Sequence, residues 1–242
     1  RAYTAYLAIA KTANKGDKVL SADKLSIVSG SDPDLDYQIT SAFVLGKQAL
    51  DKADAEDIWS LALARENIVI PLVRSFLIGV LREVEGIIAN RISEVDEARE
   101  KQIEGDYFYR IVESFIAQDN PSGSNQIKTQ LTGDLSSVVA DQIVSEISRG
   151  ILGQIKRSIQ QIEVNYISGD KNQALSALER LSLYSGIFSS DLNQRLGTPK
   201  RSSLENAIRD LKDAINTGNT GRAVALRSIL TTIIAEYKDK LF

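Results

Sequence analysis

Cysteine, histidine and methionine are all absent from this sequence of 242 residues. The lack of cysteine excludes disulfides, thiol nucleophiles and thiolate metal sites. The lack of histidine removes the commonest general base and the commonest transition-metal ligand. A Ser-His-Asp triad, a zincin site and a zinc finger are therefore impossible in this chain.

Glycine and proline are scarce, with 15 and 4 residues, and hydrophobic residues make up 43% of the chain. This balance favours helices over strands and allows a sizeable core. Charged residues interrupt every apolar run before it reaches the length of a bilayer, so we expect no membrane insertion. The net charge is −3 with the two signs interspersed, so we expect no nucleic-acid partner.

Helical periodicity runs through the chain between proline-containing polar stretches at Pro33, Pro121 and Pro199, which predict loops. We therefore predict an all-α fold, a helical bundle of about seven to nine helices with one long central helix. The whole chain, residues 1–242, is expected to form a single domain, and any sub-boundary would fall near residues 119–134.

The spacing of apolar residues sets approximate helix limits. Before the last three helices, we expect helices at about Tyr3 to Asn14, Asp36 to Lys52, Ala55 to Val95, Asp106 to Gln118 and Asp134 to Tyr166.

Several positions within these segments carry further predictions. Pro71 predicts a kink or restart and a polar pocket in the long third helix. An isoleucine ladder from Ile143 to Ile162 steps mostly by four and winds around its helix, so that helix should be central. Gly150 and Gly153 on it predict a close helix crossing.

The last three helices carry cap signals of their own. We expect them to begin at Asp170, at a Ser202-x-x-Glu205 capping box and at Thr220.

Oxygen-bearing side chains on helices are the remaining candidates for chemistry. Carboxylate and phenolate are hard donors that suit Fe³⁺, Mg²⁺, Ca²⁺ or Mn²⁺ better than copper or zinc. The candidate metal ligands are Glu66, Glu83, Glu85, Glu104, Tyr107 and Glu113. No catalytic residue is predicted, and we expect a protein that is not an enzyme.

Each candidate also has a purely structural interpretation. Glu66 could form a salt bridge to a neighbouring helix, and Glu83 and Glu85, about 200° apart around their helix, could be solvated surface carboxylates. Around Tyr107, the acids could cap a helix that begins at Asp106, with Tyr107 in the core on the face of Ile111.

Two segments resemble one known family. Residues Ala64–Val73 and Glu104–Ile111 are similar to segments of the low-iron-inducible periplasmic proteins of algae and cyanobacteria, an iron-assimilating family, and the resemblance covers roughly residues 55–165. It implies a helical, exported protein that captures or hands over iron. Arg82-Glu83-Val84-Glu85 also resembles the R-E-x-x-E motif of iron permeases, with the second glutamate one residue early.

We therefore expect an exported, non-catalytic iron-binding or iron-uptake accessory protein, with Fe³⁺ as its metal and an iron transporter or other membrane-associated protein as its partner. The chain begins at Arg1, which favours a removed signal peptide or an expressed fragment, and we expect a periplasmic or extracellular location. Two alternatives stay open. One is a helical protein-interaction or scaffold module without metal, and the other is an extracytoplasmic ligand-binding domain of a sensor or permease.

Overall fold

The computed structural model describes residues 2–10, 35–52 and 55–241, with residues 55–58 described by backbone alone. Within these ranges the chain forms nine α-helices and one 3-10 turn, and no strand. The predicted all-α bundle is confirmed. None of the helices in these ranges combines the length and the apolar character that a membrane span requires.

From α3 onward the helices follow one another with short connections. After an N-terminal helix over residues 2–10 come α2 (Leu35–Lys52), α3 (Ala55–Asn90), α4 (Val95–Ala117), α5 (Pro121–Thr132), the turn η1 (Leu135–Ser137), α6 (Ala140–Ile167), α7 (Lys171–Leu196), α8 (Thr198–Thr217) and α9 (Thr220–Lys238). The predicted first helix reaches Asn14, and its last four residues lie outside the described residues.

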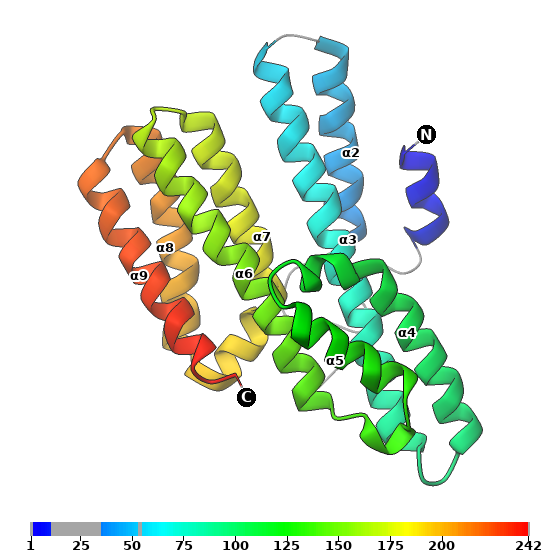
Figure 1. The fold of residues 1–242 in the computed structure, drawn as a ribbon. Helices are drawn as coiled ribbons and strands as arrows, with labels where there is room; N and C mark the ends of the chain where they lie inside the picture. The colour runs from blue at the N-terminus through cyan, green and yellow to red at the C-terminus, as the bar shows by residue number, and fades with distance from the viewer. Residues whose placement is uncertain (1, 11–34, 53–54, 242) are drawn as a thin grey trace.

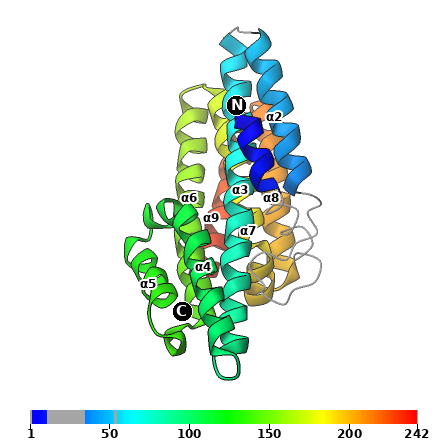
Figure 2. The same ribbon diagram turned by 90° about the vertical axis from the view of Figure 1, so that its right-hand side faces the viewer.

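The longest helix, α3, runs through the length of the molecule (Figure 2). One half pairs with α2 in a projecting hairpin, and the other half packs against α4 (Figure 1). Helix α3 also contacts α6 and α7, so it joins the two sides of the structure as the predicted long central helix.

Helices α6 to α9 form a four-helix bundle in which each helix packs against the next and α6 also contacts α9 (Figure 1). Short junctions reverse the chain between them. Gly197 and Gly218 hold positive φ angles of 83° and 70° at two of these junctions, a conformation that side chains rarely adopt. The connections are therefore tight enough to make successive helices antiparallel neighbours.

The isoleucine ladder lies in the core, as predicted. Its six members on α6 are all buried: Ile143, Ile147, Ile151, Ile155, Ile159 and Ile162. Helix α6 contacts α3, α4, α5, α7 and α9, which is why a stripe that winds around the helix stays buried along its length.

The close helix crossing predicted at Gly150 and Gly153 is also confirmed. A Cβ atom at Gly150 would lie 3.0 Å from the Ile116 Cα of α4, and one at Gly153 would lie 2.2 Å from the Asp119 Cβ. Both glycines therefore permit a contact that any larger residue would obstruct.

The predicted start of the fourth helix at Asp106 is wrong, because α4 begins eleven residues earlier at Val95. Asp106 lies inside the helix and is buried. Gly105 does not end the helix, and its place in α4 is a close contact with α3 and α5. A Cβ atom there would lie 3.3 Å from the Glu83 Cβ and 3.4 Å from a Leu131 methyl group.

The polar stretch at Pro121 is not a loop, because Pro121 is the first residue of α5. Asn120 caps this helix by accepting a hydrogen bond from the Gly123 amide at 3.1 Å. Proline suits a first helical position, since the amide that it lacks would have no partner there. The following helix, α6, begins at Ala140, so the predicted start at Asp134 is wrong.

Of the three predicted caps near the end of the chain, Asp170 is confirmed and accepts from the Gln173 amide at 3.0 Å. Asn219, and not Thr220, caps α9. The predicted capping box is wrong, since α8 begins at Thr198, and Glu205 instead pairs with Arg201 one turn earlier.

Pro71 does not restart the helix, and α3 continues through it. A cavity of about 230 Å³ beside it is lined partly by Asn67, Arg74 and Glu179. The polar pocket expected at this proline is therefore present.

Candidate functional site

The six candidate ligands lie on two helices, Glu66, Glu83 and Glu85 on α3 and the other three on α4. The structure brings Glu83 and Glu104 together and leaves Glu66 and Glu113 in ion pairs elsewhere. Among the described residues, no three His, Cys, Asp or Glu side chains are placed to hold a metal ion.

Glu66 faces the four-helix bundle. Its Oε1 atom lies 3.4 Å from Arg65 on the same helix and 3.7 Å from Arg180 on α7. The carboxylate is largely buried, with 14% of the side chain exposed, so these two cations compensate its charge. The salt bridge to a neighbouring helix, one of the two interpretations of this residue, is present.

Glu83 and Glu104 meet at the contact between α3 and α4, around the ammonium group of Lys101. The Lys101 Nζ atom lies 2.9 Å from Glu104, 3.6 Å from Glu83 and 3.6 Å from Glu97. Three carboxylates thus surround one lysine. Lys101 is not among the residues predicted from the sequence, although its spacing of three and four residues from Glu104 and Glu97 on one helix signals this cluster.

The pKa of Glu83 is raised from its ordinary value because burial disfavours the carboxylate form. A hydrogen bond to Glu104 and the charge of Glu104 raise the pKa further, while Lys101 lowers it. The pKa of Lys101 is raised in turn, first by its hydrogen bond to Glu104. The cluster therefore holds a lysine cation between carboxylates, one of which resists ionisation.

Glu85 takes no part in this cluster. It is half-buried, whereas Glu83 is 7% exposed, which fits their predicted positions on different sides of α3. The interpretation of Glu83 as a solvated surface carboxylate is wrong, because α4 covers it.

Tyr107 lies on the surface and not in the core, with 71% of its area exposed. The prediction placed it on a buried face with Ile111, but Ile111 is also exposed, at 51%. The core face of α4 is instead the one that carries Tyr109, Val112 and Ile116, each 0% exposed. Spacing alone showed two apolar stripes on α4, and the prediction chose the one that faces the solvent.

An exposed apolar ridge therefore runs along α4, formed by Ile103, Tyr107 and Ile111 at spacings of four. Their exposed fractions are 65%, 71% and 51%. The ridge borders a groove between α4 and α5 with a volume of about 590 Å³, whose lining also includes Leu131 of α5. We define this surface as the α4–α5 groove.

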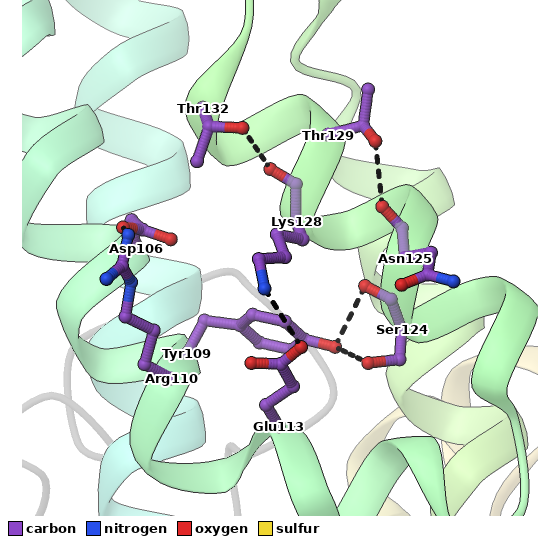
Figure 3. Close-up of polar contacts among 9 residues, drawn as sticks. All are labelled: Asp106, Tyr109, Arg110, Glu113, Ser124, Asn125, Lys128, Thr129 and Thr132. Carbon is purple, nitrogen blue, oxygen red and sulfur yellow. Dashed lines mark hydrogen bonds and ion pairs between the residues drawn. The ribbon is translucent and has the colours of Figure 1, made fainter.

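Helix α5 packs against α4 and is joined to it by polar contacts (Figure 3). The Tyr109 hydroxyl lies 2.8 Å from the Ser124 Oγ atom and donates to the Ser124 carbonyl at 3.2 Å. Lys128 of α5 pairs with Glu113 of α4 at 3.4 Å. These contacts fix the position of α5 relative to α4, and a surface whose walls are fixed before binding lowers the cost of binding.

Asp106 contributes an unsatisfied acceptor to the groove lining. Its Oδ2 atom pairs with Arg110 at 2.7 Å (both drawn in Figure 3). The buried Oδ1 atom has no hydrogen-bond partner in the part of the chain that the structure describes. A buried acceptor without a partner costs about 1–3 kcal/mol. This atom is covered, so a donor in the groove reaches it only if the Asp106 side chain turns.

Comparison with protein-family models, curated proteins and solved structures finds no match to this chain.

Proposed function

We propose that this chain is a helical interaction module whose α4–α5 groove binds an amphipathic helix of a partner protein. The ridge of Ile103, Tyr107 and Ile111 carries this proposal. Single exposed apolar residues are common on protein surfaces, but three on successive turns beside a groove are typical of binding surfaces.

The dimensions of the groove favour a helical partner. The ridge spans nine residues of α4, whose eight steps rise about 12 Å, or two turns of helix. Three apolar anchors of a second helix at i, i+4 and i+7 match that length, in the helix-in-groove mode. Asp106 lines the groove, and a lysine or arginine on the partner, placed beside it, would compete with Arg110 for its carboxylate.

Fluorescence anisotropy with synthetic amphipathic helices tests the proposal. The probes carry leucine at i, i+4 and i+7 and either lysine or glutamate at the position that faces Asp106. We expect the lysine helix to bind more tightly than the glutamate helix. Ile103→Ser and Ile111→Ser should each weaken binding about tenfold, a loss of about 1.4 kcal/mol.

Ile167→Ser is the matched control, because Ile167 is 77% exposed on α6, away from the groove. It should bind the lysine helix as the unmodified chain does. Failure of the unmodified chain to bind either helix would overturn the proposal. Self-association that Ile103→Ser abolishes would assign the groove to a second copy of this chain instead.

The cluster around Lys101 favours a second candidate function, the binding of a hard cation such as Fe³⁺ by Glu83 and Glu104. Two carboxylates that already surround an ammonium group provide the charge that a metal ion requires. The exported iron-uptake role implied by the family resemblance rests on this candidate, and the partner helix would then belong to an iron transporter or other membrane-associated protein. The cation would have to displace Lys101.

Thermal unfolding of chelator-stripped protein with Fe³⁺-citrate, Mn²⁺, Ca²⁺ or Mg²⁺ tests the second candidate. A ligand that binds only the folded state raises the melting temperature by mass action. We expect a shift with Fe³⁺ that grows in Lys101→Ala and disappears in Glu83→Gln and Glu104→Gln. Glu113→Gln, which alters a carboxylate outside the cluster, should keep the shift. An unchanged melting temperature in both the unmodified chain and Lys101→Ala would exclude the metal.

A further inference from the structure

The contact between α7 and α8 contains a cavity of about 460 Å³. Small residues of α7 line it, namely Ser182, Ser185, Gly186 and Ser189. Neighbouring helices usually fill their contact with larger apolar side chains, so this run of small residues explains why space remains. The cavity lies apart from the α4–α5 groove and has no role in the proposed function.

Positive charge predominates around this cavity. Arg74 of α3 lies in its wall with 5% of its area exposed, and Arg201, Arg209 and Lys212 of α8 also line it. Glu179 and Glu205 are the acids of the lining. Four cations against two carboxylates leave a surplus of two positive charges.

The cations of α8 differ in how far other groups of the chain satisfy them. Arg201 pairs with Glu205 at 2.7 Å, and Arg209 lies 3.6 Å from Asp210. Lys212 makes no ion pair within the described ranges of the chain. Lys212 therefore carries the positive charge of α8 that no acid within the described ranges neutralises, and Arg209 lies one turn before it on the same helix.

The rest of the lining is apolar. Leu178 and Leu204 are buried at 3% and 1%, and Leu175 and Ile208 are half-buried beside them. Serine hydroxyls on the α7 side can donate hydrogen bonds to an anion by rotating. The cavity thus offers cations and donors for a charged group and an apolar surface for a small hydrocarbon body.

We propose that the α7–α8 cavity is a binding site for a small organic anion, a phosphate ester or carboxylate with an apolar body. The anionic group lies between Arg209 and Lys212, and the apolar body covers Leu175 and Ile208, the half-buried apolar residues of the lining. This site is independent of the helix-binding groove, and neither proposal requires the other.

Isothermal titration calorimetry with phenyl phosphate, benzoate and inorganic phosphate tests the site, at one ionic strength maintained with sodium chloride because screening weakens exposed charge interactions. Phenyl phosphate and benzoate should both bind. Phenyl phosphate should bind about tenfold more tightly than inorganic phosphate, since its ring covers apolar surface.

Two kinds of variant test the location. The double variant Lys212→Gln/Arg209→Gln should weaken binding of phenyl phosphate about tenfold, and Lys156→Gln, which removes an exposed cation on α6, should leave it unchanged. Ser182→Phe fills the cavity from an exposed position without altering charge and should abolish binding.

Three results would overturn the proposal. The first is no binding of phenyl phosphate to the unmodified chain. The second is that the double variant and Ser182→Phe both bind phenyl phosphate as tightly as the unmodified chain does, which would place the anion elsewhere. The third is equal affinity for inorganic phosphate and phenyl phosphate, which would exclude the apolar part of the site.

Discussion

Tyr107 and Tyr109 lie two residues apart on α4 and in opposite environments, with exposed fractions of 71% and 0%. Tyr109 packs in the core and bonds to Ser124 of α5, and burial raises its pKa to about 12. Tyr107 stands in the middle of the exposed ridge. One helix therefore presents one tyrosine to the core and the other to the solvent.

Tyr109→Phe should destabilise the fold and leave helix binding intact. It removes the hydrogen bond to Ser124 while keeping the ring, so the free energy of unfolding should fall by about 1 kcal/mol in a urea titration. Tyr107→Phe is the matched control and should change stability by less than about 0.5 kcal/mol, since its hydroxyl is on the surface. Equal losses in the two variants would contradict the assignment.

Gly153→Ala should destabilise the contact between α6 and the end of α4. The added methyl group would meet the Asp119 side chain at 2.2 Å and disturb its two bonds to Arg157, of 2.6 and 2.7 Å. Overpacking of this kind costs about 1–3 kcal/mol, measurable as a lower urea midpoint. At Gly221 the nearest atom is 4.0 Å away, so Gly221→Ala should be neutral or slightly stabilising.

The raised pKa of Glu83 predicts how stability changes with pH. A carboxyl group whose pKa is higher in the folded state favours folding most when it is protonated. Its contribution is therefore complete below the ordinary value of 4.5 and is lost as pH rises through the folded-state pKa. As pH rises across this range, the urea midpoint of the unmodified chain should fall relative to that of Glu83→Gln, which lacks the titrating carboxyl group. Parallel pH profiles would show that Glu83 titrates normally.

Asp106→Ala should separate stability from binding. The substitution removes an ion pair with the largely exposed Arg110, which contributes little, and also the buried oxygen without a partner. Stability should therefore stay unchanged or rise by about 1 kcal/mol. The preference for the lysine helix over the glutamate helix should disappear. Glu113→Ala, which breaks the exposed pair with Lys128, should retain that preference, and its retention in Asp106→Ala would contradict the role of Asp106.

Periodicity predicted the helical class and the buried isoleucine ladder, because both depend on spacing within one segment. The start of α4 was missed because Gly105 and Asp106 together resemble a helix boundary. Gly105 instead serves a close contact with Glu83 and Leu131, residues distant in sequence, which no local pattern reveals.

The candidate site could be predicted only in part for the same reason. Glu83 and Glu104 could be named as candidate ligands from the sequence, but no local pattern shows that Lys101 lies between them. The spacing of Tyr107 and Ile111 showed an apolar stripe, and only the position of α5 determines that this stripe faces the groove and the solvent.

The most direct test of the helix-binding function is the affinity of Tyr107→Ser for the lysine-bearing amphipathic helix, measured by anisotropy beside the urea midpoint of the same sample. The account predicts binding at least about tenfold weaker than in the unmodified chain, with an unchanged midpoint, because Tyr107 contacts the partner and not the core. Binding within about twofold of the unmodified chain would contradict it.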